Sequence, residues 1–507
     1  MTARDILERL WKKMRVTNNM MRNNTLLHIQ RNKAAYNDYF AQYATQKKIQ
    51  KPSDDPTIAV RALKYRTTMV EINQYLKNCD DAENWLDATE KPMDKANEIL
   101  DTMIDYVTNA ANDPNNADDR ATIAQQLREY AGFIYEQNAN SDYAGRYLFT
   151  GFRTDVPLLF TDTQKDTTYT ITEKLDINDI NTSNFVYGQP VYDASYDADD
   201  YANAASKFLE THKISLSYNN CDVRDVQITY KDSTGAVQTI TAVTKSIPNN
   251  TVYNEQYKPG DNEVYFVPER GELVFGNGIY DLVRNGSDMS VVYDKTEFDK
   301  NDIRPEHYFD CKAVNNVTKV TKNYTNVGEQ KINYQINFSQ TLTVNTLGCN
   351  AFDTSIGRVV DQVYDVMNGL DVMEENLKAV KKRIADCDPN DKETLASLKE
   401  LSNQIETEVA LQNTVLTNTY SHAITVFQDA KNTLNVAVSD HGARYNRLKM
   451  TQSQLDTLKI DTDEAKSENE NADLEEILVN YTEADMLYQA ALQATVKIIG
   501  TSLLDFI

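Results

Sequence analysis

The residues that could bind a metal ion or build a disulfide framework are few in this chain and lie far apart. The cysteines are Cys79, Cys221, Cys311, Cys349 and Cys387, with no CxxC pair among them, and the five histidines form no HExxH motif. Zinc sites, haem attachment and disulfide frameworks all depend on such close or regular spacing. The sequence therefore predicts free thiols, buried or partly buried, with no metal and no cofactor.

Catalytic motifs are also missing from residues 151–348, the segment richest in turn residues. It has no HExxH, no nucleophile elbow and no phosphate-binding loop. Its aspartates and glutamates are scattered, which is typical of solvated carboxylates rather than of a paired acid and base. We expect no enzyme activity, and an enzyme carried on a helical frame stays as a lesser alternative.

The net charge of the chain limits the classes of molecule that it is expected to bind. The chain has 76 acidic and 52 basic residues among 507, for a net charge of -24. Such a surface disfavours nucleic acid and anionic membranes, since both reward a basic patch. The sequence has no run of eighteen apolar residues that would span a membrane and no apolar core of a secretory signal near its N-terminus. This length allows two to four domains.

The N-terminal part of the chain is expected to be helical. Residues 1–13 are interpreted as a leader or as sequence before a true start at Met14. No Gly or Pro occurs between Val16 and Gln50, which allows a helix of up to ~35 residues, about 50 Å long. Two apolar stripes run along it, one with Met20, Leu27 and Ala34, the other with Tyr36, Phe40 and Tyr43. Two stripes predict contacts on more than one side.

A joint follows at Pro52, Ser53, Asp54, Asp55 and Pro56. Pro52 disfavours helix at the residue before it, while Asp55 followed by Pro56 suits an N-cap with proline at the first helical position. From Ile58 to Val107 apolar residues step by three and four, a heptad seam with one local slip. The sequence predicts two helical segments separated by this joint.

The middle of the chain changes character. Residues 151–348 hold ten of the sixteen glycines and six of the eleven prolines, so turns concentrate there. Alternation over 226–230 and 237–241 around an Asp-Ser-Thr-Gly turn predicts a hairpin. Further strands are expected over 264–267, 273–275 and 332–344, and a short helix near 201–209. This segment is predicted to be an inserted β domain.

Helical periodicity returns after Gly348, breaks at 388–390 and resumes. From Gly442 to Ile507 the chain shows one long helical pattern that ends in a short apolar tail. Its stripe and tail include the residues Leu474, Ile477, Tyr481, Tyr488, Ile498, Leu503, Leu504 and Phe506. Narrow seams at both ends of a chain are satisfied most simply by each other, which places the termini together. The predicted fold is mainly α, with terminal helices paired as a coiled coil or bundle and a central β-rich domain.

Four stretches resemble the flagellin superfamily. They are residues 14–20 (MRVTNNM), the joint 52–56 (PSDDP), the run 145–152 (GRYLFTGF) with Tyr147, Leu148, Phe149 and Gly151, and the tail with GAR at 442–444, YQAAL at 488–492 and SLLDF at 502–506. Each motif is modest alone, and their order makes the resemblance specific. It covers about residues 14–155 and 350–507, whereas the β insert resembles no family we can name.

The resemblance implies a structural, self-assembling protein of the bacterial flagellum, concerned with motility and placed at the junction of hook and filament. It implies a secreted, extracellular protein exported unfolded by the flagellar type III system. The partners it implies are other copies of the chain in a ring or tube, the adjacent hook-associated protein 1, flagellin and an export chaperone. Its implied domains are a terminal coiled coil (14–51 and 460–507), a helical bundle (52–150 and 350–459) and an outer β-rich insert (151–349).

Within that reading, the polymer interface is assigned to both terminal stripes. It comprises Met20, Leu27, Ala34, Tyr36, Phe40, Tyr43, Leu474, Ile477, Tyr481, Tyr488, Ile498, Leu503, Leu504 and Phe506. Simple packing of one terminus on the other within a single chain stays open for the same residues. Filament flagellin itself is the nearest alternative, and a coiled-coil adhesin without a flagellar role is a third.

Overall fold

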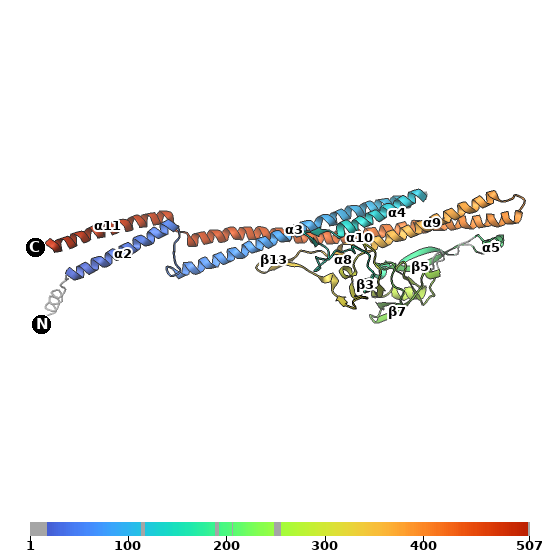
Figure 1. The fold of residues 1–507 in the computed structure, drawn as a ribbon, viewed down its shortest axis with the longest axis horizontal. Helices are drawn as coiled ribbons and strands as arrows, with labels where there is room; N and C mark the ends of the chain where they lie inside the picture. Colours follow the sequence, from blue (N-terminus) through green and yellow to red (C-terminus); the bar gives the residue numbers. More distant parts are fainter. Residues whose placement is uncertain (1–17, 113–116, 188–191, 205, 248–254, 505–507) are drawn as a thin grey trace. The chain divides into compact units, whose positions relative to one another are not determined.

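The computed structural model describes residues 18–112, 117–187, 192–204, 206–247 and 255–504 (Figure 1). These residues gather into two compact units. The first comprises residues up to Asp80, residues 335–340 and residues from Lys449 onward, and the second comprises Asp81–Tyr334 and Thr341–Leu448. Two long helices, α3 (Pro56–Asn112) and α10 (Lys392–Glu470), contribute residues to both units.

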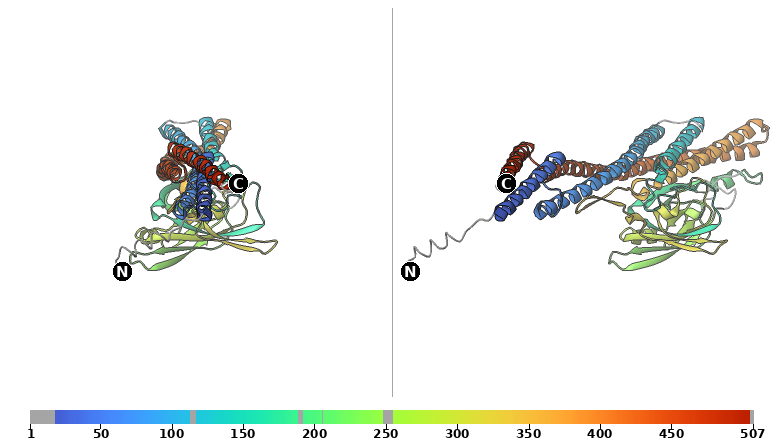
Figure 2. Two further views of the ribbon diagram at one scale, coloured as in Figure 1. Left: turned by 90° about the vertical axis from the view of Figure 1, so that its left-hand side faces the viewer. Right: turned by 60° about the vertical axis from the view of Figure 1, so that its left-hand side comes forward.

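The first unit is built from antiparallel helices. Helix α2 (Asn18–Thr45) lies beside α11 (Leu474–Leu504), so the first and last described helices run side by side (Figure 1, Figure 2). The start of α3 lies beside the end of α10, where Asn469 Nδ2 donates to the Ile58 carbonyl at 3.0 Å and Gln452 Nε2 to Asp80 Oδ1 at 3.0 Å. The predicted pairing of N- and C-terminal helices is confirmed.

The long helix predicted from Gly442 to Ile507 is wrong in one respect, because a break divides it. Helix α10 ends at Glu470 and α11 begins at Leu474. Asp473 caps the new helix, its Oδ1 accepting from the Glu475 amide at 2.9 Å. Residues 461–473 are mostly polar and contain neither Gly nor Pro, so no helix-breaking residue marks the break. Helix α2 likewise ends at Thr45, before the Gln50 that the sequence allowed.

In the second unit, α3 continues through Pro92 and lies beside α10. Asn97 Nδ2 donates to Asn435 Oδ1 at 2.7 Å, and the His441 ring is 2.9 Å from the Leu86 carbonyl. Helix α4 (Ala117–Gly132), continued by a π-helical turn η1 (Phe133–Ala139), lies on α9 (Ser355–Asp386). The predicted break near 388–390 is confirmed, since α9 ends at Asp386 and α10 begins at Lys392.

The insert holds a ten-stranded sheet in the order β12-β11-β3-β10-β6-β7-β8-β9-β5-β4. Its strands are β3 (Thr167–Leu175), β4 (Asn181–Tyr187), β5 (Lys207–Ser215), β6 (Val226–Lys231), β7 (Val237–Thr244), β8 (Val264–Val267), β9 (Glu272–Phe275), β10 (Ser287–Lys295), β11 (Asp310–Asn315) and β12 (Thr321–Tyr324). Neighbouring strands are antiparallel except β7 and β8, which are parallel. The predicted hairpin is β6–β7, and its register pairs Ile228 with Ile240.

Smaller elements complete the second unit and its borders. They are β1 (Asp142–Tyr143), β2 (Arg146–Tyr147), β13 (Asn333–Asn337), β14 (Gln340–Thr343), α5 (Ala198–Asn203), α6 (Asn277–Val283), α7 (Pro305–Tyr308), α8 (Gly348–Ala351), η2 (Ile177–Asp179), η3 (Glu255–Tyr257) and η4 (Val327–Glu329). The helix predicted near 201–209 is wrong in extent, because α5 starts earlier and residues from Lys207 form β5. An Asp197–Asp200 capping box fixes that start.

The predicted fold class is confirmed: long paired helices at both ends of the chain flank a central β-rich insert. The cysteines also agree with the prediction. All five are free, with Cys79, Cys221 and Cys311 buried and Cys349 and Cys387 partly buried. The three-domain division proposed from the sequence remains a prediction. The two compact units divide α3 after Asp80 and α10 after Leu448, and these positions differ from the predicted domain boundaries.

Candidate assembly surface at the chain termini

An aromatic cluster joins α2 to α11. Tyr36 and Tyr481 have ring centroids 5.3 Å apart, and their hydroxyls share a hydrogen bond of 3.1 Å. Tyr43 stacks on Tyr481 at 6.1 Å, and Tyr36 stacks on Tyr488 at 6.0 Å. The hydrogen bond to Tyr36 raises the pKa of Tyr481. Offset aromatic pairs of this kind stabilise beyond the area they bury, so this cluster holds the terminal helices together.

The sequence-predicted interface residues separate into three groups. Those that lie between α2 and α11 are Tyr36, Phe40, Tyr43, Ile477, Tyr481 and Tyr488. Met20, Leu27, Ala34 and Leu474 are exposed and make none of these ring contacts, whereas Phe40 and Tyr43 contact Tyr481 while remaining 50% and 43% exposed. The side chains of Ile498, Leu503 and Leu504, and the whole of Phe506, lie outside the described residues. The structure thus brings the aromatic stripe together and leaves the Met20 stripe in solvent.

An apolar face of α11 was missed by sequence reasoning. Val479 and Met486 are both 64% exposed, and they lie on the side of the helix opposite Ile477 and Ala484, which are buried. Leu487 and Val496 are exposed as well. The available signal was a second apolar stripe at helical spacing, which the first stripe concealed. Within the described residues, α2 and α11 therefore bury one face against each other and leave apolar faces uncovered.

The joint between α2 and α3 is formed by its two aspartates. Asp54 Oδ2 accepts from the amides of Lys51 at 2.9 Å and Gln50 at 3.0 Å, and these bonds lower the pKa of Asp54. Asp55 Oδ1 accepts from the Thr57 amide at 2.8 Å, which caps α3, and Pro56 is the first helical residue. Pro52 and Ser53 lie exposed in the turn.

The two helix breaks of the first unit meet each other. The Lys48 amide donates to the Glu470 carbonyl at 2.9 Å, and the Ala472 amide donates to the Gln46 carbonyl at 3.1 Å. Arg66 donates to the Glu470 carboxylate through Nε, 2.8 Å from Oε1, and through Nη2, 2.7 Å from Oε2. Lys47 Nζ lies 3.5 Å from Oε2 of the same carboxylate. Hydrogen bonding to Arg66 lowers the pKa of Glu470, whose side chain is only 6% exposed. We call Lys47, Arg66 and Glu470 the elbow network.

The family motif around Gly151 lies in the second unit, with residues 148–151 buried and Phe152 63% exposed. Leu148 and Phe149 are buried, and the Phe149 ring meets Phe352 edge-on at 4.9 Å. The Gly348 amide donates to the Phe149 carbonyl at 2.8 Å, and the Tyr147 amide to the Thr154 carbonyl at 2.8 Å. Gly151 has φ +65°, which favours glycine. These contacts tie the start of the insert to the segment that leaves it.

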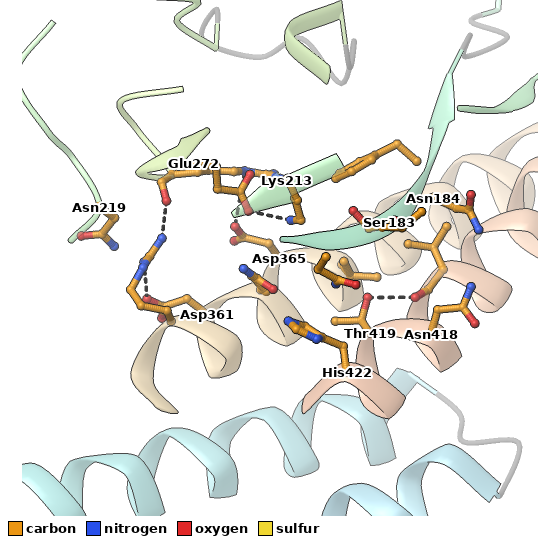
Figure 3. A pocket seen from close by; sticks show the side chains of 18 of the residues that line it. Ser183, Asn184, Lys213, Asn219, Glu272, Asp361, Asp365, Asn418, Thr419 and His422 are labelled. Carbon is orange, nitrogen blue, oxygen red and sulfur yellow. Dashed lines mark hydrogen bonds and ion pairs between the residues drawn. The ribbon is translucent and has the colours of Figure 1, made fainter. Parts of the chain in front are cut away.

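A polar cavity of about 230 Å³ lies between β4, β5 and β9 and helices α9 and α10 (Figure 3). Lys213 Nζ lies 2.6 Å from Glu272 Oε1, and Arg358 Nη1 lies 3.2 Å from Asp361 Oδ2. Arg270 also lies 3.5 Å from Asp365. Arg358 and Asp361 belong to one helix, and Lys213 and Glu272 to neighbouring strands, so each of these pairs balances charge within its own element or sheet. The Arg270–Asp365 pair and the bond from Arg358 Nε to the Leu216 carbonyl at 3.0 Å join the sheet side to α9. Burial lowers the pKa of the cavity's histidine, His422, to about 4.

Among the described residues, no three or more His, Cys, Asp or Glu side chains are placed to hold a metal ion. No described helix combines the length and apolar character that crossing a bilayer needs.

Comparisons with known proteins agree with the motifs. The N-terminal helical region of bacterial flagellin matches residues 16–154. Flagellar hook-associated protein 3 of Salmonella typhimurium is 25% identical to this chain over 142 residues, which are 28% of this chain and 45% of the relative. The resemblance to the flagellin superfamily is confirmed. Flagellar hook-associated protein 3 of Escherichia coli matches with the same identity and coverage.

This chain therefore spans 45% of the length of the curated relatives it matches. A crystal structure of flagellar hook associated protein-3 from Legionella pneumophila overlaps 80% of this chain and 97% of its own, at 12% identity and a TM-score of 0.28. At this identity and score, the overlap adds nothing to the sequence matches. The flagellin-superfamily resemblance rests on the N-terminal helical region and on the motifs within it.

Proposed function

We propose that this chain is a structural protein of the bacterial flagellum that joins hook to filament and assembles with copies of itself through α2 and α11. The observation that carries the proposal is the terminal helix pair, in a chain whose residues 16–154 match the flagellin N-terminal helical region. Similarity to hook-associated protein 3 of two bacteria supports the junction rather than another flagellar position.

The uncovered apolar faces of the terminal pair support assembly. Contiguous exposed apolar faces on a soluble protein mark places where another molecule docks. Met486 and Val479 on α11, with Met20 and Leu27 on α2, form such faces. Their burial against neighbouring copies, at about 25 cal/mol per Å² of apolar surface, offsets the entropy lost when copies associate.

The proposed role is structural and not catalytic, and the proposed partners are other flagellar proteins. The chain would contact the adjacent hook-associated protein 1 on one side and flagellin on the other, and it would reach this extracellular place through the flagellar type III system with an export chaperone. In the cavity of the second unit, Glu272 accepts hydrogen bonds from both Lys213 and Tyr257. Because its charge is already paired, we assign this cavity a structural role.

The test is to remove the chain from the bacterium that makes it and to return a tagged copy. A tag can be inserted in the turn at residues 233–235, between β6 and β7, because these residues are exposed and exposed loop tips tolerate insertion. We expect cells without the chain to carry hooks without filaments and to release flagellin into the medium. Electron microscopy with a labelled antibody should then place the tag between hook and filament.

Copy number separates the junction role from that of filament flagellin, which shares the matched N-terminal region. A junction protein is needed in few copies per flagellum, whereas a filament protein forms the whole filament. Quantitative mass spectrometry of sheared flagella should find this chain at a small fraction of the major flagellin. Label along the whole filament, or normal filaments in cells that lack the chain, would overturn the proposal.

A further inference from the structure

A hollow of about 750 Å³ lies in the insert, where β3 and β6 end and β10 begins. It is lined by Lys174 on β3, Lys231 on β6, Arg284 after α6 and the segment 286–290. The three basic side chains are exposed, and Ser290 is partly buried. Cavities of ~300–1,000 Å³ are the size that small ligands occupy. We call this hollow the bulge pocket.

A β-bulge shapes the bulge pocket. The three steps of β10 from Ser287 to Ser290 oppose only two steps of β6, so β10 carries one extra residue. Asp288 in this bulge has φ +50°, a backbone conformation that is uncommon for residues other than glycine. A Cβ on Gly286 would lie 2.5 Å from the Lys231 carbonyl oxygen, so glycine allows the close approach to β6. Bulges that re-aim side chains, and backbone outliers of this kind, cluster at functional sites.

The charge of the bulge pocket is opposite in sign to that of the chain. Lys174, Lys231 and Arg284 line it together with Asp176 and Asp288, three basic groups against two acidic, whereas the whole chain has a net charge of -24. Lys231 Nζ lies 2.7 Å from Asp288 Oδ2, and this hydrogen bond, together with the charge of Lys174, lowers the pKa of Asp288. Asp176 caps η2. The pocket can therefore accept one further negative charge.

The lining favours a sugar over a polyanion. Ser287 and Ser290 supply hydroxyls beside the basic groups, and Asp176 and Asp288 supply carboxylates. Hydroxyls donate and accept hydrogen bonds, and carboxylates accept them, so both kinds of group can bond to the hydroxyls of a sugar. Nucleic acids and polyphosphates instead reward dense positive charge, which the two carboxylates oppose. A hydroxyl-rich ligand with a single carboxylate matches this lining.

We propose that the bulge pocket binds a carboxylate-bearing sugar, such as a uronic acid unit of an acidic saccharide. Lys174 and Arg284 pair with the carboxylate of the ligand, while Ser287, Ser290 and Asp288 bond to its hydroxyls. The site lies within the insert of one chain and needs no contact between copies. The inference therefore goes beyond the proposed function and does not depend on it.

Isothermal titration calorimetry of the untagged full chain tests the site. The probe is trigalacturonate, and maltotriose is its neutral counterpart with the same number of sugar units. We expect trigalacturonate to bind at one site per chain, and maltotriose to bind at least tenfold more weakly. A third titration uses pyrophosphate, which should bind more weakly than trigalacturonate. Absence of trigalacturonate binding, equal binding of maltotriose or tighter binding of pyrophosphate would each overturn the proposal.

Two variants test the basic groups. Lys174→Ala and Arg284→Ala should each weaken trigalacturonate binding about tenfold, the loss expected when one charge-assisted hydrogen bond is removed. Lys312→Ala is the matched control, because Lys312 is exposed on β11 of the same sheet and does not line the pocket. It should bind like the parent chain. Equal weakening in Lys312→Ala would indicate a general effect of charge and would count against the assigned site.

Hydrogen exchange on the parent chain locates the ligand without any substitution. Saturating trigalacturonate should slow amide exchange at least twofold in residues 174–178 and 284–290, which surround the bulge pocket. The cavity between the sheet and helices α9 and α10 serves as the internal comparison and should be unaffected. Slowed exchange there, with residues 284–290 unchanged, would place the ligand elsewhere and overturn the proposal.

Discussion

Glu470 shows how much one buried carboxylate can organise in this protein. It ends α10, its carbonyl accepts from the Lys48 amide, and its side chain is held by Arg66 and approached by Lys47. A charge this deeply buried needs partners, because desolvation alone would push it toward its neutral form. The elbow network therefore fixes the break between α10 and α11 against the break between α2 and α3.

Replacing Glu470 by Gln should lower the free energy of unfolding of the first unit by about 1 kcal/mol, a modest value because Arg66 is largely exposed. The pKa of Glu470 is lower in the folded protein than in the unfolded chain. The stabilising effect of Glu470 is therefore complete above its pKa in the unfolded chain, about 4.3. This effect is lost as the pH falls through its pKa in the folded protein. Urea titrations at pH 7 and below pH 4 should show the difference between parent and variant shrinking in acid.

Gly151 is a second position where a single residue type is required. Its φ is +65°, and a Cβ there would meet Gln330 Oε1 and lie 3.1 Å from Leu347 Cδ2. Gly151→Ala should destabilise the second unit by roughly 2 kcal/mol, through backbone strain and overlap together. Gly145→Ala is the control, since its φ is +76° but no atom lies within 4 Å of the added carbon. It should cost about 1 kcal/mol, and equal losses in the two variants would contradict the overlap argument.

At the scale of elements, the sequence was most informative where periodicity was long. The heptad seam from Ile58 to Val107 predicted α3, and the aspartate cap with a following proline predicted where it begins. The break at residues 471–473 was not predicted, because it contains neither Gly nor Pro. Asp473 followed by Glu475 is nevertheless a helix-start signal. The order of strands in the sheet is set by pairings between distant residues, such as β3 with β10, and no local pattern encodes them.

The terminal helices offer a test at this same scale. Tyr481→Ala removes the ring that contacts Tyr36, Phe40 and Tyr43, so α2 and α11 should open more often. Hydrogen exchange followed by mass spectrometry should show amide protection in residues 18–45 falling about tenfold, with the strands of the insert unchanged. Leu487→Ala, at an exposed position of α11, should leave that protection intact, and unaltered protection in Tyr481→Ala would count against the aromatic cluster as the source of pairing.

At the scale of the whole molecule, stability and assembly should separate. Met486→Glu places a charge on the uncovered face of α11 without touching the aromatic cluster. We expect the thermal unfolding temperature to stay within about 1 °C of the parent, since exposed substitutions change stability little, while incorporation at the hook tip falls at least tenfold. Val317→Glu, an exposed position of the insert, is the control and should incorporate normally. Normal incorporation of Met486→Glu would remove this face from the interface.

The side-by-side position of α2 and α11 also means that the N-terminal helix depends on the last helix of the chain for its packing partner. The partner that covers Tyr36 arrives more than four hundred residues later in the chain, at Tyr481. A product that stops anywhere before Leu474 leaves α2 with its aromatic face in water and nothing to close on it. Truncated molecules would thus leave the ring of Tyr36 without Tyr481 and Tyr488, which cover part of it in the whole chain.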